Sequence, residues 1–245
     1  MPEKPPDPHA ESMAELRAFF PAFLSGTERV VVELRALGCP RDYGGPITRS
    51  GFFDLPSARK EFALAVRSLL GDSAGQPEAI YVTLNALDPN LLARANNRLK
   101  GQIGKASICA ADANVLQRRW LLIDVDPVRI SGVSATDAEK TAARAVLDAV
   151  RGDLDSRGWP APMTIDSGNG FHAWYRIDLP ANDDGIVKDI LATLARKHNT
   201  AAATVDTSVF NASRIAKLPG TWARKGDSTP ERPHRMARVL EVPDP

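Results

Sequence analysis

The chain has little cysteine and no long apolar run. Cys39 and Cys109 are its only cysteines, far apart and without a CxxC partner. This disfavours a zinc site and a disulfide framework, and it is typical of a protein in a reducing cytoplasm. Nothing approaches the roughly 18 consecutive apolar residues of a membrane helix, and no cationic segment leads into an apolar one as in a signal peptide. We therefore expect a cytoplasmic protein with no zinc and no membrane contact.

What the chain does contain is an ordinary globular composition with an uneven charge distribution. Hydrophobic residues make up 43% and charged residues 25% of the 245 positions, which suits one large domain or two small ones. The net charge is +1, yet residues 94–119 hold six bases against one acid, and residues 206–238 hold seven against three. Such bases can bind a polyanion if they gather on one face. Scattered, solvated side chains are the alternative.

The hydrophobic pattern predicts an α/β or α+β fold with a hairpin in its middle. Residues 1–11, with four prolines, are expected to form a loose leader. Strand-like runs cover residues 29–37, 47–53, 79–84, 119–127, 163–166, 171–178 and 236–242. Helical patterns cover residues 12–20 (ended by Pro21), 56–70, 90–97, 136–157 and 184–198. Asn169-Gly170 between two strands is a hairpin signal, and residues 98–118 form a long basic connection.

The most informative stretch is RWLLIDVDP at residues 119–127. An apolar run leads directly into two acids, and the alternation of a strand puts Asp124 and Asp126 on one face. Two carboxylates about 7 Å apart along a strand can hold Mg²⁺ or Mn²⁺, which prefer oxygen ligands. For an isolated pair, a strand end capped by solvated acids is the more common explanation. Other residues of the chain are needed to distinguish it from a metal site.

The predicted hairpin supplies a histidine near this pair. His172, Trp174 and Arg176 share one face of its second strand. Because the opposite face is more apolar and should meet the core, we expect these three to line a cleft. His172 can then contact a phosphate, act as a general acid or ligate a metal. A histidine that only caps the turn is the alternative.

Three further residues suit the same chemistry. Asp206 follows an apolar residue near the end of a predicted element, and it can complete a three-carboxylate metal site. If residues 213–220 take a helical turn, Arg214 and Lys217 lie on one side of it. Two bases beside metal ions are what a triphosphate needs, because its charge has to be neutralised in the transition state. A solvated surface pair is the alternative for these bases.

Together these motifs resemble those of a known superfamily. The Asp-x-Asp strand, the Ser-Gly-Asn-Gly-Phe-His hairpin, and Val-Asp followed by Asn-x-x-Arg-Ile-x-Lys-Leu-Pro-Gly-Thr resemble the three motifs of archaeo-eukaryotic primases. The closest likeness is to the bifunctional DNA primase/polymerase domains of phage, plasmid and other mobile elements. Upstream, YVTLN (residues 81–85) and LLARANNRL (residues 91–99) resemble the first half of such domains. The resemblance extends from about residue 28 to residue 225.

The resemblance implies a fold, a reaction and a set of roles. One α+β domain, residues 12–245, would join an N-terminal α/β unit (12–115) to an RRM-like palm (116–245). The catalytic residues would be Asp124, Asp126, Asp206 and His172, with two Mg²⁺ or Mn²⁺ ions on the three aspartates. The nucleoside triphosphate would be bound by His172, Arg214, Lys217, Ser167 and Asn169. The single-stranded DNA template would be held by Arg98, Lys100, Lys105, Arg118, Arg119, Arg224 and Lys225.

In this reaction, a 3′-hydroxyl attacks the α-phosphate of the nucleotide and pyrophosphate leaves. The resemblance also implies a replicative helicase, fused or separate, as a partner, and a location on the replicon or nucleoid. One departure concerns the second motif, usually Ser-x-His: Gly170 stands two residues before His172, and Ser167 stands five before it. Two alternatives remain, namely a replication-initiator or single-strand-binding module without chemistry, and a metal-dependent phosphodiesterase.

Overall fold

The computed structural model describes residues 7–101 and 108–243, and it has an α+β fold of helices and antiparallel strands. The helices are α1 (Ala10–Leu24), α2 (Arg59–Leu70), α3 (Asp137–Ser156) and α4 (Ile186–His198). The longer strands are β1 (Val30–Cys39), β2 (Ile47–Leu55), β3 (Ala79–Thr83), β6 (Val115–Pro127), β7 (Met163–Asp166), β8 (Phe171–Pro180) and β13 (Arg238–Glu241). The shorter strands are β4 (Ala86–Leu87), β5 (Lys100–Gly101), β9 (Ala203–Val205), β10 (Ile215–Lys217), β11 (Trp222–Ala223) and β12 (Arg235–Met236).

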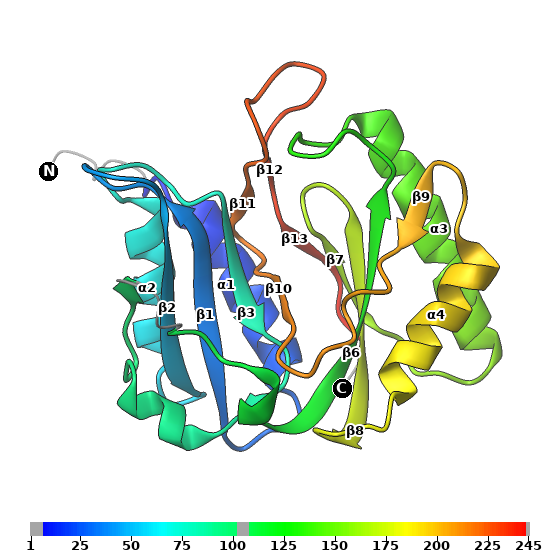
Figure 1. The fold of residues 1–245 in the computed structure, drawn as a ribbon, viewed down its shortest axis with the longest axis horizontal. Helices are drawn as coiled ribbons and strands as arrows, with labels where there is room; N and C mark the ends of the chain where they lie inside the picture. Colours follow the sequence, from blue (N-terminus) through cyan, green and yellow to red (C-terminus); the bar gives the residue numbers. More distant parts are fainter. Residues whose placement is uncertain (1–6, 102–107, 244–245) are drawn as a thin grey trace, which may run out of the picture.

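One bent sheet runs through the molecule in the order β10-β3-β1-β4-β6-β8-β7-β13, with β2 beside β1 and β9 beside β6. Figure 1 shows two lobes: a first lobe of β1, β2, β3 and α2, and a second lobe of β6, β7, β8, β9, α3 and α4. Strand β4 connects them, because it pairs with both β1 and β6. Strand β10 comes from the C-terminal part of the chain but pairs with β3. The first lobe is therefore completed by residues far beyond position 115.

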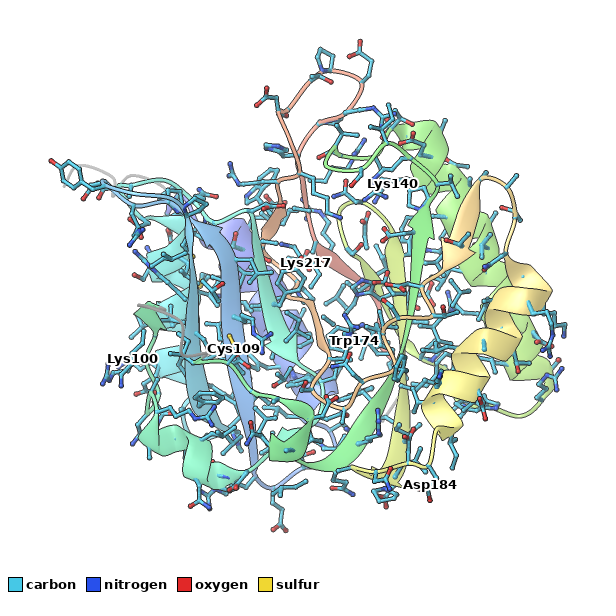
Figure 2. The ribbon with its side chains drawn as sticks, viewed as in Figure 1. Lys100, Cys109, Lys140, Trp174, Asp184 and Lys217 are labelled. Carbon is cyan, nitrogen blue, oxygen red and sulfur yellow. The ribbon has the colours of Figure 1, made fainter. Side chains whose placement is uncertain are left out.

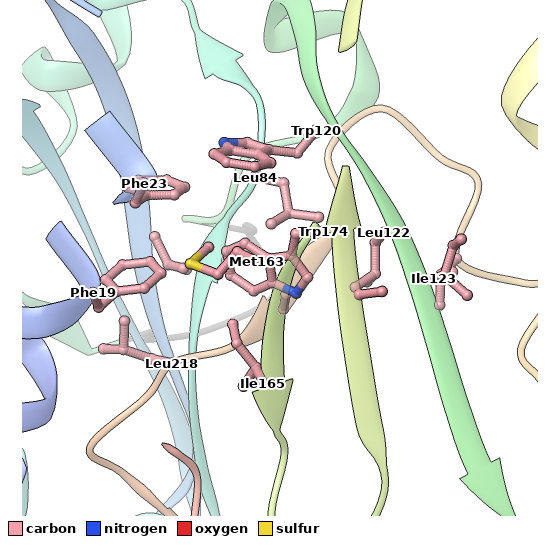
Figure 3. Packing of buried hydrophobic residues seen from close by; sticks show 14 of the residues in the cluster. Phe19, Phe23, Leu84, Trp120, Leu122, Ile123, Met163, Ile165, Trp174 and Leu218 are labelled. Atoms are coloured by element: carbon pink, nitrogen blue, oxygen red, sulfur yellow. The ribbon is translucent and has the colours of Figure 1, made fainter. Parts of the chain in front are cut away.

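Helix α1 packs between the lobes through its aromatic side chains. Phe20 meets Phe62 of α2 with ring centroids 5.4 Å apart, while Phe19 meets Trp174 of β8 edge to face at 5.8 Å (Figure 3). Such aromatic pairs add directional attraction to a large buried apolar area. The expectation that Trp174 lines a cleft is wrong, since this side chain is 0% exposed. Helix α1 covers this face at Trp174, whereas His172 and Arg176, on either side of it, line two separate cavities.

Helix α1 also differs from its expected bounds. It begins at Ala10, so the leader is shorter than eleven residues, and it continues through Pro21 to Leu24. A proline inside a helix removes one backbone hydrogen bond, and here the buried Phe19, Phe20 and Phe23 hold the helix in place. Tertiary packing therefore outweighs the local stop signal.

The helix expected over residues 90–97 is a single 3₁₀ turn, Pro89–Ala93. Its start is as the sequence indicates, since the Asp88 side chain accepts a hydrogen bond from Asn90 N–H. The turn ends early because the residues after it form hydrogen bonds with β2 instead. Phe52 N–H donates to Ala95 O, and Asn97 N–H donates to Phe52 O. Asn97 adopts a left-handed conformation with φ 49°, which asparagine tolerates better than most residues.

The second lobe follows its sequence signals closely. The Thr136/Glu139 capping box starts α3 as predicted, and β7 and β8 form the predicted hairpin around the left-handed Gly168. Its elements occur in the order β6-α3-β7-β8-α4-β9, and its strands lie in the sheet order β9-β6-β8-β7. In residues 7–101 and 108–243, no helix is long and apolar enough to cross a membrane.

Candidate functional site

A polar cavity of about 100 Å³ lies between the lobes, where the end of β6 faces β3 and β10. Its acidic wall is Asp124 and Asp126 of β6, beside His172 of β8. Its basic wall is Lys217 of β10 with Arg224 and Lys225, and Figure 2 shows Lys217 between the lobes. Ser167 and Asn169 of the hairpin also line it, as do Tyr81 and Glu78. Elements from four separate parts of the chain thus meet at one polar site.

The two aspartates differ in their electrostatic surroundings. Burial works to raise the pKa of Asp124, but the adjacent His172 and the positive charges of Lys225 and Arg214 lower it below its ordinary value. Burial and the neighbouring Asp124 charge raise the pKa of Asp126. Two like charges in one cavity disfavour each other's ionisation. The pKa values of the two carboxyls are therefore shifted in opposite directions, although Arg129, Lys225 and His172 act to lower that of Asp126.

His172 is held between Asp124 and a tryptophan. The β6–β8 register places it directly opposite Asp124, and its Nε2 lies 3.4 Å from Asp124 Oδ1. Trp174 Nε1–H donates to His172 Nδ1 at 3.4 Å. Because an indole N–H can only donate, Nδ1 is the accepting nitrogen and the ring proton of the neutral imidazole is on Nε2. The ring is thus oriented with an N–H at the cavity.

The hairpin turn fits against β6 because of a glycine. Ser167 Oγ accepts from Gly170 N–H at 3.1 Å, and Asn169 Oδ1 accepts from Ala135 N–H at 2.8 Å. A Cβ on Gly170 would lie 2.3 Å from Val125 O and 2.8 Å from Asp126 Oδ1. This contact gives a physical reason for the departure in the second motif, since a serine side chain has no room where Gly170 stands.

Asp206 is joined to Asp124 through its backbone but is not among the residues that line the cavity. It follows β9, and its backbone N–H donates to Asp124 O at 2.8 Å, which continues the β6–β9 pairing. Its carboxylate accepts from Ser208 N–H at 2.8 Å. Over the two described ranges, no group of three or more His, Cys, Asp or Glu side chains converges as metal ligands. Asp124 and Asp126 offer the oxygen donors that a hard divalent cation prefers.

Lys217 is the most deeply buried base of the cavity. It is 4% exposed, its Nζ donates to Trp222 O at 2.6 Å, and it lies 5.6 Å from the centre of the Tyr81 ring. Burial, with the nearby charges of Arg224 and Lys225, lowers the pKa of Lys217 to about 7 despite the opposing effect of Glu78.

The expected helical turn over residues 213–220 is wrong. Residues Ile215–Lys217 form strand β10 instead, because they complete the edge of β3. A spacing of three in a strand points side chains to opposite faces, so Arg214 and Lys217 do not act as a pair. Arg214 instead donates to Ser208 O at 2.6 Å, although its charge still helps to lower the pKa of Asp124.

The bases expected to hold a template divide into several groups. Arg224 and Lys225 line the cavity. Arg118 is buried against Asp183 at 3.1 Å and bonds two backbone carbonyls, so its charge is used within the fold, and Arg119 is also buried. Arg98 and Lys100 are exposed, with Lys100 on the outer edge of the first lobe, away from Lys217 (Figure 2). Lys105 lies outside the described residues.

Three further residues lie at the site to which the sequence alone assigns no role there. Arg129, whose side chain is 8% exposed, lies 3.4 Å from Asp126 Oδ1. Tyr81 faces the acids from the other lobe, and burial together with the charges of Asp124, Glu78 and Asp126 raises its pKa to about 12. Glu78 lies on the approach to β3. The i,i+3 spacing of Arg129 from Asp126 and the position of Tyr81 in the YVTLN stretch are hints, but neither predicts that Tyr81 and Glu78 meet the acids, because they come from a strand distant in the sequence.

No family model matches the chain, and a search of curated proteins finds no significant match.

Replacing Gly170 by serine should destabilise the protein by about 1–3 kcal/mol, because the new Cβ has to displace the Val125 carbonyl. Urea denaturation of the wild type and the variant measures the difference. Gly45→Ser is the matched control, since nothing lies within 4 Å of a Cβ at Gly45, and a change within about 0.5 kcal/mol is expected there. Equal effects of the two substitutions would contradict the close packing of the hairpin on β6.

Lys217→Met should remove a pH dependence of stability. Between the folded pKa of about 7 and the ordinary value of 10.5, the unfolded chain binds a proton at this lysine that the folded chain does not. Wild-type stability should therefore rise with pH over this range relative to Lys217→Met. Urea denaturation at pH 7, 8.5 and 10 tests this, with the exposed Lys188→Met as control. If the difference in the free energy of unfolding between wild type and Lys217→Met does not change with pH, the pKa of Lys217 is not lowered in the folded protein.

Proposed function

We propose that this chain is a DNA primase/polymerase catalytic domain, which joins nucleotides on a single-stranded DNA template during replication of a phage, plasmid or other mobile element. One observation carries the proposal. Two paired carboxylates, Asp124 and Asp126, face the bases Lys217, Arg224 and Lys225 across a single cavity. Nucleotidyl transfer needs both sets, because carboxylates hold divalent cations and bases neutralise the triphosphate.

The arrangement of the second lobe supports the proposal. The element order β6-α3-β7-β8-α4-β9, with sheet order β9-β6-β8-β7, is the β-α-β-β-α-β arrangement of ferredoxin-like folds, to which an RRM-like palm belongs. In this interpretation the acids lie at the end of the palm's first strand, where α3 and α4 do not cover them. The first lobe then closes the opposite side of the cavity with β3 and β10.

The metal ions of the proposal would be Mg²⁺ or Mn²⁺ on Asp124 and Asp126, with Asp206 as the neighbouring third carboxylate. When bound, they would favour ionisation of the attacking 3′-hydroxyl and stabilise the pyrophosphate leaving group. Asp124 is ready for this role, because its lowered pKa keeps it ionised. In the structure one oxygen of the Asp206 carboxylate accepts from Ser208 N–H, and its other oxygen would be the one to turn to a cation.

The other residues would bind and orient the nucleotide. His172 presents Nε2–H at the cavity, where it can donate to a phosphate oxygen. Lys217, Arg224 and Lys225 would neutralise the remaining phosphate charge, and a polyanion would favour the charged form of Lys217, whose pKa burial has lowered. Template phosphates would follow the same basic wall outward. A replicative helicase, fused or separate, fits this role as a partner.

The proposal is tested with labelled nucleoside triphosphates, a single-stranded template and Mg²⁺ or Mn²⁺, with and without a primer. The wild type should extend or start strands, and Asp124→Asn should reduce incorporation by at least about 100-fold, because it removes the charge that holds the cation. Asp148→Asn, an exposed aspartate paired with Arg144 on α3, is the control and should remain active.

Other outcomes of the same assay identify the alternatives. DNA binding that is insensitive to chelators, without incorporation, would indicate a replication-initiator or single-strand-binding module. Shortening of the labelled strand would indicate a phosphodiesterase. Either result would overturn the proposal, as would full incorporation by a correctly folded Asp124→Asn protein.

His172→Gln should mainly raise KM for the nucleotide. The proposed contact is to a phosphate that is present in both the ground state and the transition state, so its loss weakens binding without slowing the chemical step. A lost hydrogen bond to a charged group corresponds to an increase of roughly 10- to 100-fold. Steady-state kinetics with varied nucleotide measure it. A fall in kcat at constant KM would instead show that His172 acts on the transition state alone.

A further inference from the structure

Trp174 is a buried side chain that contacts the candidate site without lining it. It is 0% exposed and is not among the residues around the cavity at Asp124. Its indole Nε1–H donates to His172 Nδ1 at 3.4 Å, and within residues 7–101 and 108–243 this is the one acceptor that the indole has. Any large aromatic ring would fill the core at this position. The N–H group therefore needs an explanation of its own.

Three aromatic rings fix the direction of this N–H. Phe19 and Phe23 of α1 lie with their ring centroids 5.8 Å and 6.2 Å from that of Trp174, and Trp120 of β6 lies at 6.1 Å (Figure 3). A side chain in so closely packed an interior cannot leave its rotamer without displacing its neighbours. The orientation of the indole is therefore set by α1 and β6, outside the cavity.

The imidazole ring of His172, in contrast, has two orientations of nearly the same shape. A half-turn about χ2 exchanges each ring nitrogen with a carbon, and histidine tolerates both settings of this torsion. The indole N–H distinguishes them, because it has an acceptor only when Nδ1 faces Trp174. A proton on Nδ1 would face the proton of the indole, which can only donate. Trp174 thus selects both the orientation and the tautomer of His172.

This selection limits the chemistry of His172. A histidine nitrogen needs a free lone pair to ligate a metal or to accept a proton. The lone pair of Nδ1 accepts from Trp174, and Nε2, 3.4 Å from Asp124 Oδ1, carries the proton of the neutral ring. Of the three roles that the sequence leaves open, donation of a hydrogen bond to an anionic group is the one that this arrangement favours.

We propose that Trp174 is a positioning residue for nucleotide binding, because its indole N–H, held by Phe19 and Phe23, turns His172 so that Nε2–H faces the phosphates. The phosphate contact rests on the proposed function, whereas the orientation of the imidazole ring does not. Helix α1 is then more than a packing element between the lobes. Through Trp174 it sets the direction of a donor in the cavity.

The chain contains a matched control for this hydrogen bond. Trp120 belongs to the same aromatic cluster as Trp174 and is 3% exposed. Its Nε1 has no hydrogen-bond partner among the described residues. Trp120→Phe and Trp174→Phe both remove part of a buried indole, but only the second removes a donor to His172.

The first measurement is the tautomer of His172 in ¹⁵N-labelled protein at pH 8.5, about two units above the ordinary histidine pKa. Two-bond ¹H–¹⁵N spectra distinguish the tautomers, and His172→Gln identifies the signals of His172 among the four histidines. The wild type should show His172 only as the Nε2–H form. Trp174→Phe should also populate the Nδ1–H form, and Trp120→Phe should keep the wild-type pattern.

Steady-state kinetics then connects this orientation to nucleotide binding. Trp174→Phe should raise KM for the nucleotide about three- to tenfold at constant kcat, which is the factor for a competent orientation populated a third to a tenth of the time. Trp120→Phe should leave KM unchanged. In the His172→Gln background, Trp174→Phe should add no further increase, because a residue that acts only through His172 has no effect once that side chain is replaced.

Four results would overturn the proposal: an Nδ1–H form in the wild type, an unchanged tautomer in folded Trp174→Phe, equal effects of the two Trp→Phe substitutions, or a further rise of KM in the His172→Gln background. If Trp174→Phe does not fold, 3-benzothienylalanine at position 174 replaces it, since this residue has the shape of tryptophan with sulfur in place of the N–H. A wild type that incorporates no nucleotide would overturn the proposed function instead, and the NMR spectra would still show whether Trp174 orients His172.

Discussion

The antiparallel pairing of β6 is the constraint on which the rest of the structure depends. This strand is bonded to β8 along most of its length, to β9 at its acidic end and to β4 at its start. Its register places His172 opposite Asp124, and the bond from Asp206 N–H to Asp124 O adds the third acid on the other side. A shift by one residue would move every side chain of β6 to the opposite face, so the site and the core are fixed by the same hydrogen bonds.

The charge distribution of the cavity follows from where the two lobes meet. The second lobe contributes the acids, whereas β10 and the residues after β11 contribute the bases from the side of the first lobe. The aromatic contacts of Phe19 and Phe20 hold the two sides in register through α1. Burial lowers the pKa of Lys217, which forms no ion pair with a carboxylate of the described residues, and the charge of Glu78 only partly opposes this; burial also raises the pKa of Asp126. A bound cation would lower the pKa of Asp126, and a bound polyanion would raise the pKa of Lys217.

The parts of this structure that the sequence predicts are those with local causes. The capping box of α3 and the Asn169-Gly170 hairpin formed as expected, because turn and cap chemistry act within a few residues. The predictions from sequence are wrong where contacts with distant parts of the chain determine the local structure. Residues Ile215–Lys217 became β10 because β3 offered an open edge more than 130 positions earlier, and Pro21 stayed helical because of buried aromatic packing. Counting basic residues does not identify a template-binding surface for a related reason. Arg118 adds to the count, but in the fold its charge is neutralised by Asp183.

The absence of a side chain at position 170 has a structural cause. The hairpin turn approaches β6 so closely that a side chain at position 170 would meet the Val125 carbonyl. That approach places Asn169 where it bonds Ala135 N–H at the start of α3, and it holds the turn over the Asp126 carboxylate. A hydroxyl two residues before His172 would require the turn to move away. The absence of a side chain at Gly170 and the tight packing of the turn on β6 therefore go together, and the Ser167 hydroxyl is used within the turn, where it accepts a hydrogen bond from Gly170 N–H.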